Sequence, residues 1–303
     1  MAPAIIASEG RDTMIWYERM NKAINYIEDN LCGEIDFDEI AKIACQSSVS
    51  FQRTFSIVTE ISVFEYIRRR KLTLAAFDLQ NGNDKVIDIA LKYGYESPEA
   101  FSRAFKETHG TSPSNVRKRV LPLKAYPRIA FLLSIKGEAV MEYKIERKEA
   151  FSVYGIEGIF TMDDGKHLVD IPAFWQKCME DGSFDKLVKS TNDSQCRIHS
   201  VCDYRKTGGN TFPYMLFAHR TKDCNTDGFT QVEIPAATWA IFKSEKFPMA
   251  QTSTVVQGLT KRIYTDWLPT ASFTKVEGYE LELYFVSDSD NSTCEVWIRV
   301  EPK

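Results

Sequence analysis

The sequence has little of what builds metal centres, disulfide frameworks or common catalytic sets. Among its 303 residues there are four histidines and seven cysteines, and no two cysteines are spaced as CxxC. Structural zinc sites and disulfide frameworks need cysteines or histidines at close spacings, so neither is indicated, and we expect no metal, no cofactor and a reducing cytoplasm. No Ser/His/Asp or Cys/His set is legible, and no catalytic role is assigned to the scattered histidines, His109, His167, His199 and His219.

The chain also lacks long apolar runs and an excess of positive charge. No apolar run reaches the ~20 residues of a membrane-spanning helix. Residues 1–13, MAPAIIASEGRDT, lack the basic start and apolar core of a secretory signal, so we interpret them as an N-terminal tail and expect no membrane partner. The net charge of −4 excludes a chain coated with positive charge. Nucleic-acid binding would therefore depend on where the lysine and arginine side chains gather on the surface.

Residues 90–116 are the most informative stretch, because they predict two short helices joined by a tight turn. Gly94 can adopt the positive φ at which the first helix ends, and Ser97 has the side chain to cap the second. Phe101 and Phe105 share an inward face, which leaves polar and basic side chains outward. Such a pair can place its second helix in a DNA major groove, although a single instance is more often part of an ordinary helical domain.

A second copy of this unit lies upstream and makes the DNA-binding interpretation much stronger. Residues 35–44 predict an amphipathic helix, and residues 49–58 predict another after the turn CQSS. Aligning SSVSFQRTF with SPEAFSRAF keeps Phe, Arg and Phe at the same spacing. Residues 64–80 predict a long helix between the units, which could set both second helices in successive major grooves about 34 Å apart.

Residues 15–120 resemble the AraC/XylS family of bacterial transcription regulators, chiefly through YGYESPEAFSRAFKETHGTSP. The resemblance implies an all-α DNA-binding domain over residues 14–120, with two helix-turn-helix units, double-stranded promoter DNA as ligand and RNA polymerase as partner. Glu60 departs from the family, which usually has a helix-ending glycine there. The DNA-binding residues that the resemblance and the outward helix faces imply are Ser48, Val49, Gln52, Arg53 and Ser56 in the first unit and Pro98, Glu99, Ser102, Arg103 and Lys106 in the second.

The chain is longer than one typical domain, and its second half changes character. Residues 121–140 carry prolines and a glycine among apolar residues, which predicts an ordered linker that packs against another part of the chain. From residue 141 onward a strand–helix–strand–strand order occurs twice, with residues 232–247 as one strand that opens the second copy. We therefore predict a multidomain protein: an all-α double helix-turn-helix domain followed by an α+β domain, residues 141–303, built from two β-α-β-β repeats with a groove where they meet.

Three pieces of the second half, VEIPAATWAIF, YTDWLP and GYELELYF, resemble the GyrI-like effector-binding domain. The resemblance implies a cleft for small molecules, which in some relatives are bulky, often cationic aromatic compounds held around a glutamate. In YELELYF, strand alternation puts Glu280, Glu282 and Tyr284 on one face and two leucines on the other, and we expect the leucine face to cover the helices. The candidate ligand-binding residues are Glu282, Tyr284, Trp239, Trp267, Tyr154 and Tyr214.

Two classes of function remain open. The leading one is a sequence-specific, DNA-binding transcription regulator, not an enzyme, whose C-terminal domain binds a small-molecule effector. A cationic aromatic compound is the candidate effector, because a carboxylate neutralises a cation while aromatic faces attract it. The alternative is a GyrI-like domain acting as a small-molecule hydrolase or ligand sink, with Glu282 as a base. In a simpler interpretation, Glu282 is a solvated residue and the tryptophans only fill the core.

Overall fold

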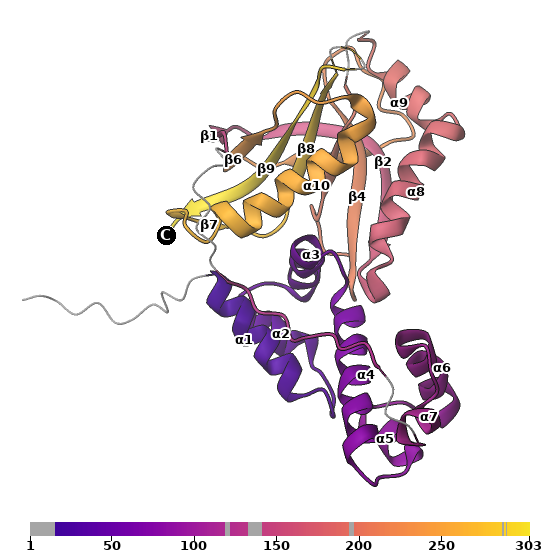
Figure 1. Ribbon diagram of the computed structural model, residues 1–303. Helices are drawn as coiled ribbons and strands as arrows, with labels where there is room; N and C mark the ends of the chain where they lie inside the picture. The colour runs from indigo at the N-terminus through magenta and orange to yellow at the C-terminus, as the bar shows by residue number, and fades with distance from the viewer. Residues whose placement is uncertain (1–15, 119–121, 133–140, 194–196, 287, 289) are drawn as a thin grey trace, which may run out of the picture.

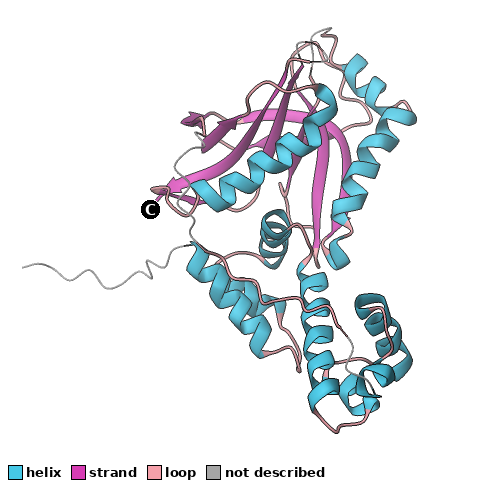
Figure 2. Ribbon diagram, in the orientation of Figure 1, coloured by secondary structure: helices cyan, strands magenta, loops and turns pink. Residues whose placement is uncertain are grey.

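The computed structural model describes residues 16–118, 122–132, 141–193, 197–286, 288 and 290–303. A helical half lies below a half in which a curved sheet carries helices on one side (Figures 1 and 2). No helix within these ranges is long and apolar enough to cross a membrane. The predicted tail, residues 1–13, lies outside the described residues.

The helical half contains the two predicted helix-turn-helix units. In both, the second helix begins at a serine whose side chain accepts a hydrogen bond from the backbone N–H three residues on, Ser47 for α3 and Ser97 for α6. The described helices are α1 (Trp16–Asp29), α2 (Phe37–Ala44), α3 (Ser48–Thr59), α4 (Val63–Asn81), α5 (Val86–Lys92), α6 (Pro98–His109) and α7 (Pro113–Lys118).

Helix α4 joins the two units by contributing to the core of each. Its first half places Tyr66 and Ile67 in a core with Phe51 and Phe55 of α3. Its second half places Leu72, Leu79 and neighbouring alanines in a separate core with Phe101 and Phe105 of α6. The predicted connecting helix is therefore a shared element that fixes the distance between α3 and α6.

Glu60 ends α3 in the left-handed conformation, with φ 62° and ψ 12°. Its backbone N–H donates to the Ser56 carbonyl, as a helix-ending glycine would do in this position. A side chain in this conformation costs roughly 1–2 kcal/mol compared with glycine. The departure from the family's glycine thus leaves the end of the helix intact.

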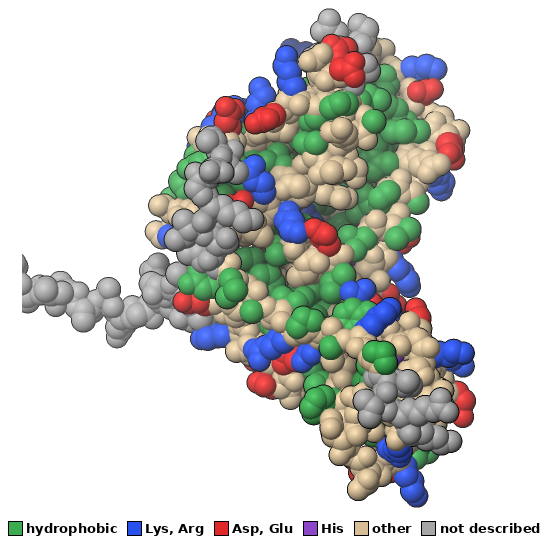
Figure 3. Space-filling view, in the orientation of Figure 1, with side chains coloured by type: hydrophobic (Ala, Val, Ile, Leu, Met, Phe, Trp, Pro, Cys, Tyr) green, Lys and Arg blue, Asp and Glu red, His purple; other side chains and the backbone are tan. Residues whose placement is uncertain are grey.

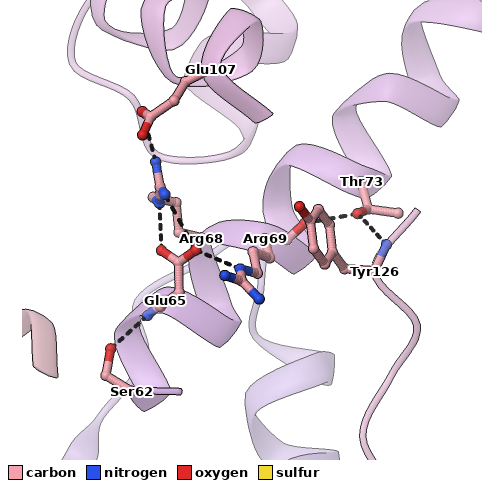
Figure 4. Close-up of polar contacts among 7 residues, drawn as sticks. All are labelled: Ser62, Glu65, Arg68, Arg69, Thr73, Glu107 and Tyr126. Atoms are coloured by element: carbon pink, nitrogen blue, oxygen red, sulfur yellow. Dashed lines mark hydrogen bonds and ion pairs between the residues drawn. The ribbon is translucent and has the colours of Figure 1, made fainter. Parts of the chain in front are cut away.

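The linker between the halves packs against the helical half along residues 122–132. Phe131 is buried beside α1, where its backbone N–H and carbonyl are both hydrogen-bonded by the Asn21 side chain, at 2.8 and 2.7 Å. Tyr126 donates its backbone N–H to Thr73 Oγ1 of α4 at 3.1 Å (Figure 4). The predicted packing is confirmed for this stretch, whereas residues 133–140 lie outside the described part.

The second half is an antiparallel sheet with the strand order β1-β6-β9-β8-β3-β4-β2-β5, and β7 pairs with β9. The order is symmetric about its centre, because β6-β9-β8 mirrors β2-β4-β3 and the two copies meet at β8 and β3. The predicted β-α-β-β repeats are thus β2-α8-β3-β4 and β6-α10-β8-β9. The strands are β1 (Tyr143–Lys148), β2 (Phe151–Thr161), β3 (His199–Cys202), β4 (Thr211–His219), β5 (Thr230–Ile234), β6 (Ala237–Lys243), β7 (Phe273–Lys275), β8 (Glu280–Val286) and β9 (Ser292–Pro302). The helices are α8 (His167–Glu180), α9 (Ser183–Ser190) and α10 (Thr252–Arg262), which continues directly into a π-helical segment, Ile263–Trp267 (η3). Short 3₁₀ helices lie at Asp163–Gly165 (η1) and Met249–Gln251 (η2).

The single strand predicted for residues 232–247 is wrong. The chain breaks after Ile234, so that β5 pairs with β2 at one edge of the sheet while β6 pairs with β1 and β9 near the other. Pro235 explains the break, because proline has no N–H to donate to a strand ladder.

Candidate functional site

The alternation predicted for β8 is present, but the helices cover the opposite face from the one expected. Leu281 and Leu283 pack with Trp239 and Trp297 on the face away from the helices. Glu282 lies level with Val296 and Ser200 on the neighbouring strands, and this row packs toward α8, α9 and α10. The curved sheet buries its leucine face among its own strands, so the carboxylates share their face with the helices.

Glu282 lies in a cage of hydrogen-bonding and aromatic side chains. Its Oε2 accepts hydrogen bonds from Ser200 Oγ at 2.8 Å and from Tyr284 Oη at 2.6 Å. The Trp175 ring of α8 meets the Tyr284 ring edge to face at 5.7 Å, and its Nε1 donates to Tyr214 Oη at 2.8 Å. Burial, reinforced by the Glu282 charge, raises the pKa of both tyrosines, so their hydroxyls remain protonated donors.

Glu280 lies two residues earlier on the same face and is buried among cations. Its carboxylate accepts hydrogen bonds from Tyr264 Oη at 2.9 Å and pairs with Lys275 Nζ at 2.8 Å and with the guanidinium of Arg53. Burial alone would raise the pKa of Glu280, but the charges of Arg53 and Lys275 hold it well below the usual value. We call Glu280, Glu282, Tyr264, Tyr284, Tyr214 and Trp175 the acidic aromatic cluster.

Arg53 comes from α3, the second helix of the first helix-turn-helix unit, so this helix lies directly against the C-terminal half. Figure 1 shows α3 at the base of the sheet between α10 and β4. Gln52 Nε2 donates to Asn210 Oδ1 in the β3–β4 loop at 3.2 Å, and Ser48 Oγ approaches the same oxygen at 3.5 Å. At the other end of the helix, Glu60 pairs with Lys261 of α10.

Apolar side chains of α3 join the cores of both repeats. Val49 packs into the cluster under α8 and α9, where Phe160 and Tyr214 lie. Ile57 and Val58 pack into the cluster under α10. Helix α3 therefore bridges the two repeats at the place where a groove between them is predicted.

The predicted DNA-binding residues are covered in the first unit and open in the second. In α3, Gln52 is 1% exposed, Ser56 is 2% exposed and the Arg53 side chain is 16% exposed. Val49 and Ser48 are partly buried. In α6, Glu99, Arg103 and Lys106 are exposed, and Pro98 and Ser102 are partly exposed. No observation tests whether these side chains touch DNA, so their role stays a prediction.

The basic run at the start of α4 is engaged within the protein. Arg68 and Arg69 both pair with Glu65, and Arg68 also reaches Glu107 of the second unit at 3.2 Å (Figure 4). Basic and acidic side chains also alternate over the face drawn in Figure 3. This part of the chain therefore offers fewer free cations to phosphates than its sequence suggests.

Three of the six predicted ligand-binding residues come together, namely Glu282, Tyr284 and Tyr214. Tyr154 belongs to the same buried cluster as Tyr214, but its hydroxyl meets Ser190 Oγ at 3.0 Å. Trp239 is fully buried on the leucine face, and Trp267 packs edge to face on Phe242 under α10. Alternation along β8 predicted that Glu280 shares the face of Glu282. The resemblance covered Tyr264 within YTDWLP without giving it a role, and no signal in the sequence singled out Trp175.

A hollow of about 620 Å³ lies elsewhere on the C-terminal half. It opens where β2 begins and β4 ends, at the opposite end of β4 from Asn210 and α3. Its lining of Phe151, Ser152, His219, Arg220, Thr221, Lys222, Cys224 and Thr226 contains no carboxylate, so we do not assign the effector to it.

Comparison with known proteins adds independent findings on both halves. Residues 144–300 match the model of the Integron-associated effector binding protein family, Cass2, and residues 40–119 match a helix-turn-helix domain model. The chain is 39% identical over 98 residues to the HTH-type transcriptional activator AarP of Providencia stuartii, which is 32% of this chain and 73% of AarP. It is 36% identical over 97 residues to the regulatory protein SoxS of Salmonella typhimurium, 32% of this chain and 91% of SoxS. The solved structure of SAV2435 bound to tetraphenylphosphonium is similar to 53% of this chain and 94% of that one, at 17% identity and a TM-score of 0.42.

Proposed function

The chain belongs to the AraC-type transcription regulators through its helix-turn-helix half and to the integron-associated effector binding proteins through its C-terminal half, and we propose that its acidic aromatic cluster binds an organic cation. The family assignments confirm the predicted fold class and the predicted DNA-binding regulator with a GyrI-like effector-binding domain. The identity of the contacting residues and the chemistry of the effector are the proposal.

The observation that carries the proposal is that the cluster already accommodates a delocalised organic cation. The Arg53 guanidinium pairs with Glu280, whose other oxygen accepts from Tyr264. Glu282, Tyr284 and Trp175 lie on the same face and add a second carboxylate with aromatic rings. Carboxylates that offset charge beside rings that bury apolar surface are the features that bind aromatic cations.

On the DNA side, we propose that α3 and α6 read promoter DNA as a pair held by α4. Gln52 can bond adenine, whereas Arg53 and Arg103 can bond guanine or phosphate. Ser48, Val49, Ser56, Pro98, Glu99, Ser102 and Lys106 complete the proposed contact set. We further propose a cytoplasmic location and RNA polymerase as the partner that receives the signal.

An enzymatic role receives less support from the site. Glu282 accepts hydrogen bonds from Ser200 and Tyr284 at Oε2, which leaves this oxygen less free to act as a base. The curated relatives are transcription regulators. We therefore propose a sensor without turnover.

Thermal unfolding of the full chain with tetraphenylphosphonium tests the effector site. A ligand at a hundred times its Kd stabilises the folded state by about 2.7 kcal/mol, so the cation should raise the Tm by several degrees, and neutral triphenylphosphine oxide should not. Glu282→Gln should abolish the shift. Glu295→Gln is the matched control, because Glu295 lies on the adjacent strand level with Leu283, on the opposite face. Equal shifts for both compounds, or a full shift in Glu282→Gln, would overturn the proposal.

A further inference from the structure

Helix α3 packs against the acidic aromatic cluster through its outward face, which is the surface proposed to bind DNA. The cluster in turn is the surface proposed to bind the effector. The α3 side chains proposed to read bases are the ones that face Asn210 and Glu280. We propose that α3 is an internal ligand of the effector site, in which Arg53 takes the place of the organic cation. Effector and α3 then compete, and effector binding releases α3 for DNA. This inference rests on the proposed function.

The charges around Glu280 explain why a cation is the ligand that can replace α3. Arg53 and Lys275 pair with Glu280, and Glu282 lies nearby on the same face. Without Arg53, the carboxylates of Glu280 and Glu282, with that of Asp203 close enough to interact with Glu280, outnumber the one lysine, and a buried charge without a partner is costly. An organic cation would replace the lost positive charge, whereas a neutral compound of the same shape would not.

The packed position of α3 is incompatible with reading DNA. A recognition helix must present its outward side chains to base edges in the major groove. Gln52 is 1% exposed and Arg53 is turned into the cluster, so the sheet half occupies the space that the duplex would need. In the second unit, α6 stays exposed, so α3 is the one of the two helices that cannot reach DNA in this arrangement.

The arrangement in which α3 packs on the acidic aromatic cluster, here called the closed state, leaves the hydrogen bonding of Gln52 incomplete. Gln52 Nε2 is hydrogen-bonded to Asn210, but the buried Gln52 Oε1 has no hydrogen-bond partner among the described residues. An unsatisfied buried polar atom costs about 1–3 kcal/mol. Gln52 is therefore better suited to a partner that engages both ends of its carboxamide, as adenine does, than to the closed state.

Calorimetric titration of the full chain with tetraphenylphosphonium tests the competition. If Arg53 is an internal competitor, Arg53→Ala should bind the cation at least about tenfold more tightly than the wild type. The reason is that a larger fraction of the molecules then has a cluster free of α3 and able to bind the cation. Arg103→Ala is the matched control, because Arg103 holds the equivalent place in α6, away from the cluster, and its cation affinity should not change. In a chain carrying Gln52→Cys, the cation should also speed maleimide labelling at residue 52, followed by peptide mass spectrometry.

Asn210→Ala provides a second route if Arg53→Ala folds poorly by circular dichroism. Asn210 contacts α3 from a partly exposed loop, so its loss should tighten cation binding more modestly and without touching the carboxylates. Cation binding that is unchanged or weaker in both variants, with unchanged labelling of residue 52, would overturn the inference and leave the proposed function standing. Failure of every variant to bind the cation would overturn both.

Discussion

Helices α3 and α6 hold equivalent places in two copies of one unit, and SSVSFQRTF aligns with SPEAFSRAF, yet they meet different surroundings. Both bury a pair of phenylalanines in the core of their own unit. The outward side of α3 is buried against the sheet half, while the outward side of α6 is open. The inward face of each helix therefore follows from its own unit, but its exposure is set by the other half of the chain.

The aligned positions differ where α3 meets the sheet half. Val49 stands where α6 has Glu99, and Ile57 stands where α6 has Glu107. The apolar members pack into the two cores of the C-terminal half, whereas Glu107 is 70% exposed at its side chain. Apolar residues on the outward side of a recognition helix thus mark the helix that another part of the protein covers.

Removing the carboxylate that pairs with Arg53 should reduce the difference in exposure between α3 and α6 most. Glu280→Gln leaves two buried cations without their counter-charge, and breaking such a pair costs about 3–5 kcal/mol. We expect α3 to leave the cluster and residue 52 to label at a rate close to that of residue 102, each as a cysteine variant. Glu295→Gln on the neighbouring strand should leave the labelling rates unequal. Slow labelling of residue 52 in Glu280→Gln would show that this ion pair does not hold α3.

The difference in exposure between α3 and α6 can be measured at two matched positions, residues 52 and 102. In otherwise unchanged chains, Gln52→Cys should react with maleimide about a hundredfold more slowly than Ser102→Cys, which corresponds to an opening free energy of ~2.8 kcal/mol. Peptide mass spectrometry separates these sites from Cys32 and Cys45, which are exposed. Equal rates would mean that α3 is not covered in solution.

A glycine at the contact between the halves offers a way to force them apart. Gly165 has φ +70°, and a Cβ added there would lie 2.8 Å from Cβ of Ser62, which caps α4. Gly165→Ala should therefore raise the labelling rate of residue 52 by about tenfold, or ~1.4 kcal/mol. Gly182→Ala controls for backbone strain, because Gly182 has φ +80° with nothing within 4 Å of the added Cβ. Similar rates in both variants would assign the effect to strain alone.

DNA affinity, measured with a duplex selected from a random library, should also respond differently to substitutions in α3 and α6, with smaller effects than those on labelling. Without a cation, Ser102→Ala should weaken binding by roughly 1 kcal/mol, about fivefold, while Gln52→Ala should cause no loss of DNA affinity because α3 is covered by the sheet half. With tetraphenylphosphonium present, both variants should weaken binding. Fluorescence anisotropy at fixed salt measures these affinities, and a loss in Gln52→Ala without cation would contradict the closed state.

Much of the fold was predictable because its signals are local. The cap at Ser97 and the matched phenylalanine spacing predicted both helix-turn-helix units, and the recurring strand–helix–strand–strand order predicted the β-α-β-β repeats. The side of the sheet that carries the helices was predicted wrongly, because alternation shows two faces without showing what covers each. The packing of α3 on the cluster was not predicted, since Arg53 and Glu280 are 227 residues apart and their pairing depends on how the halves meet.

The packed linker sets how strongly Arg53 competes for the cluster. Its described part is held on the helical half as far as Phe131, and Tyr143 begins the first strand of the sheet half. The chain from Phe131 to Tyr143 has twelve Cα steps and cannot span more than about 40 Å even when fully extended. Arg53 therefore stays near the cluster at an effective concentration on the order of millimolar. Such a tether sets a threshold, so that abundant but weakly bound cations would leave the regulator silent while a tightly bound one would trigger it.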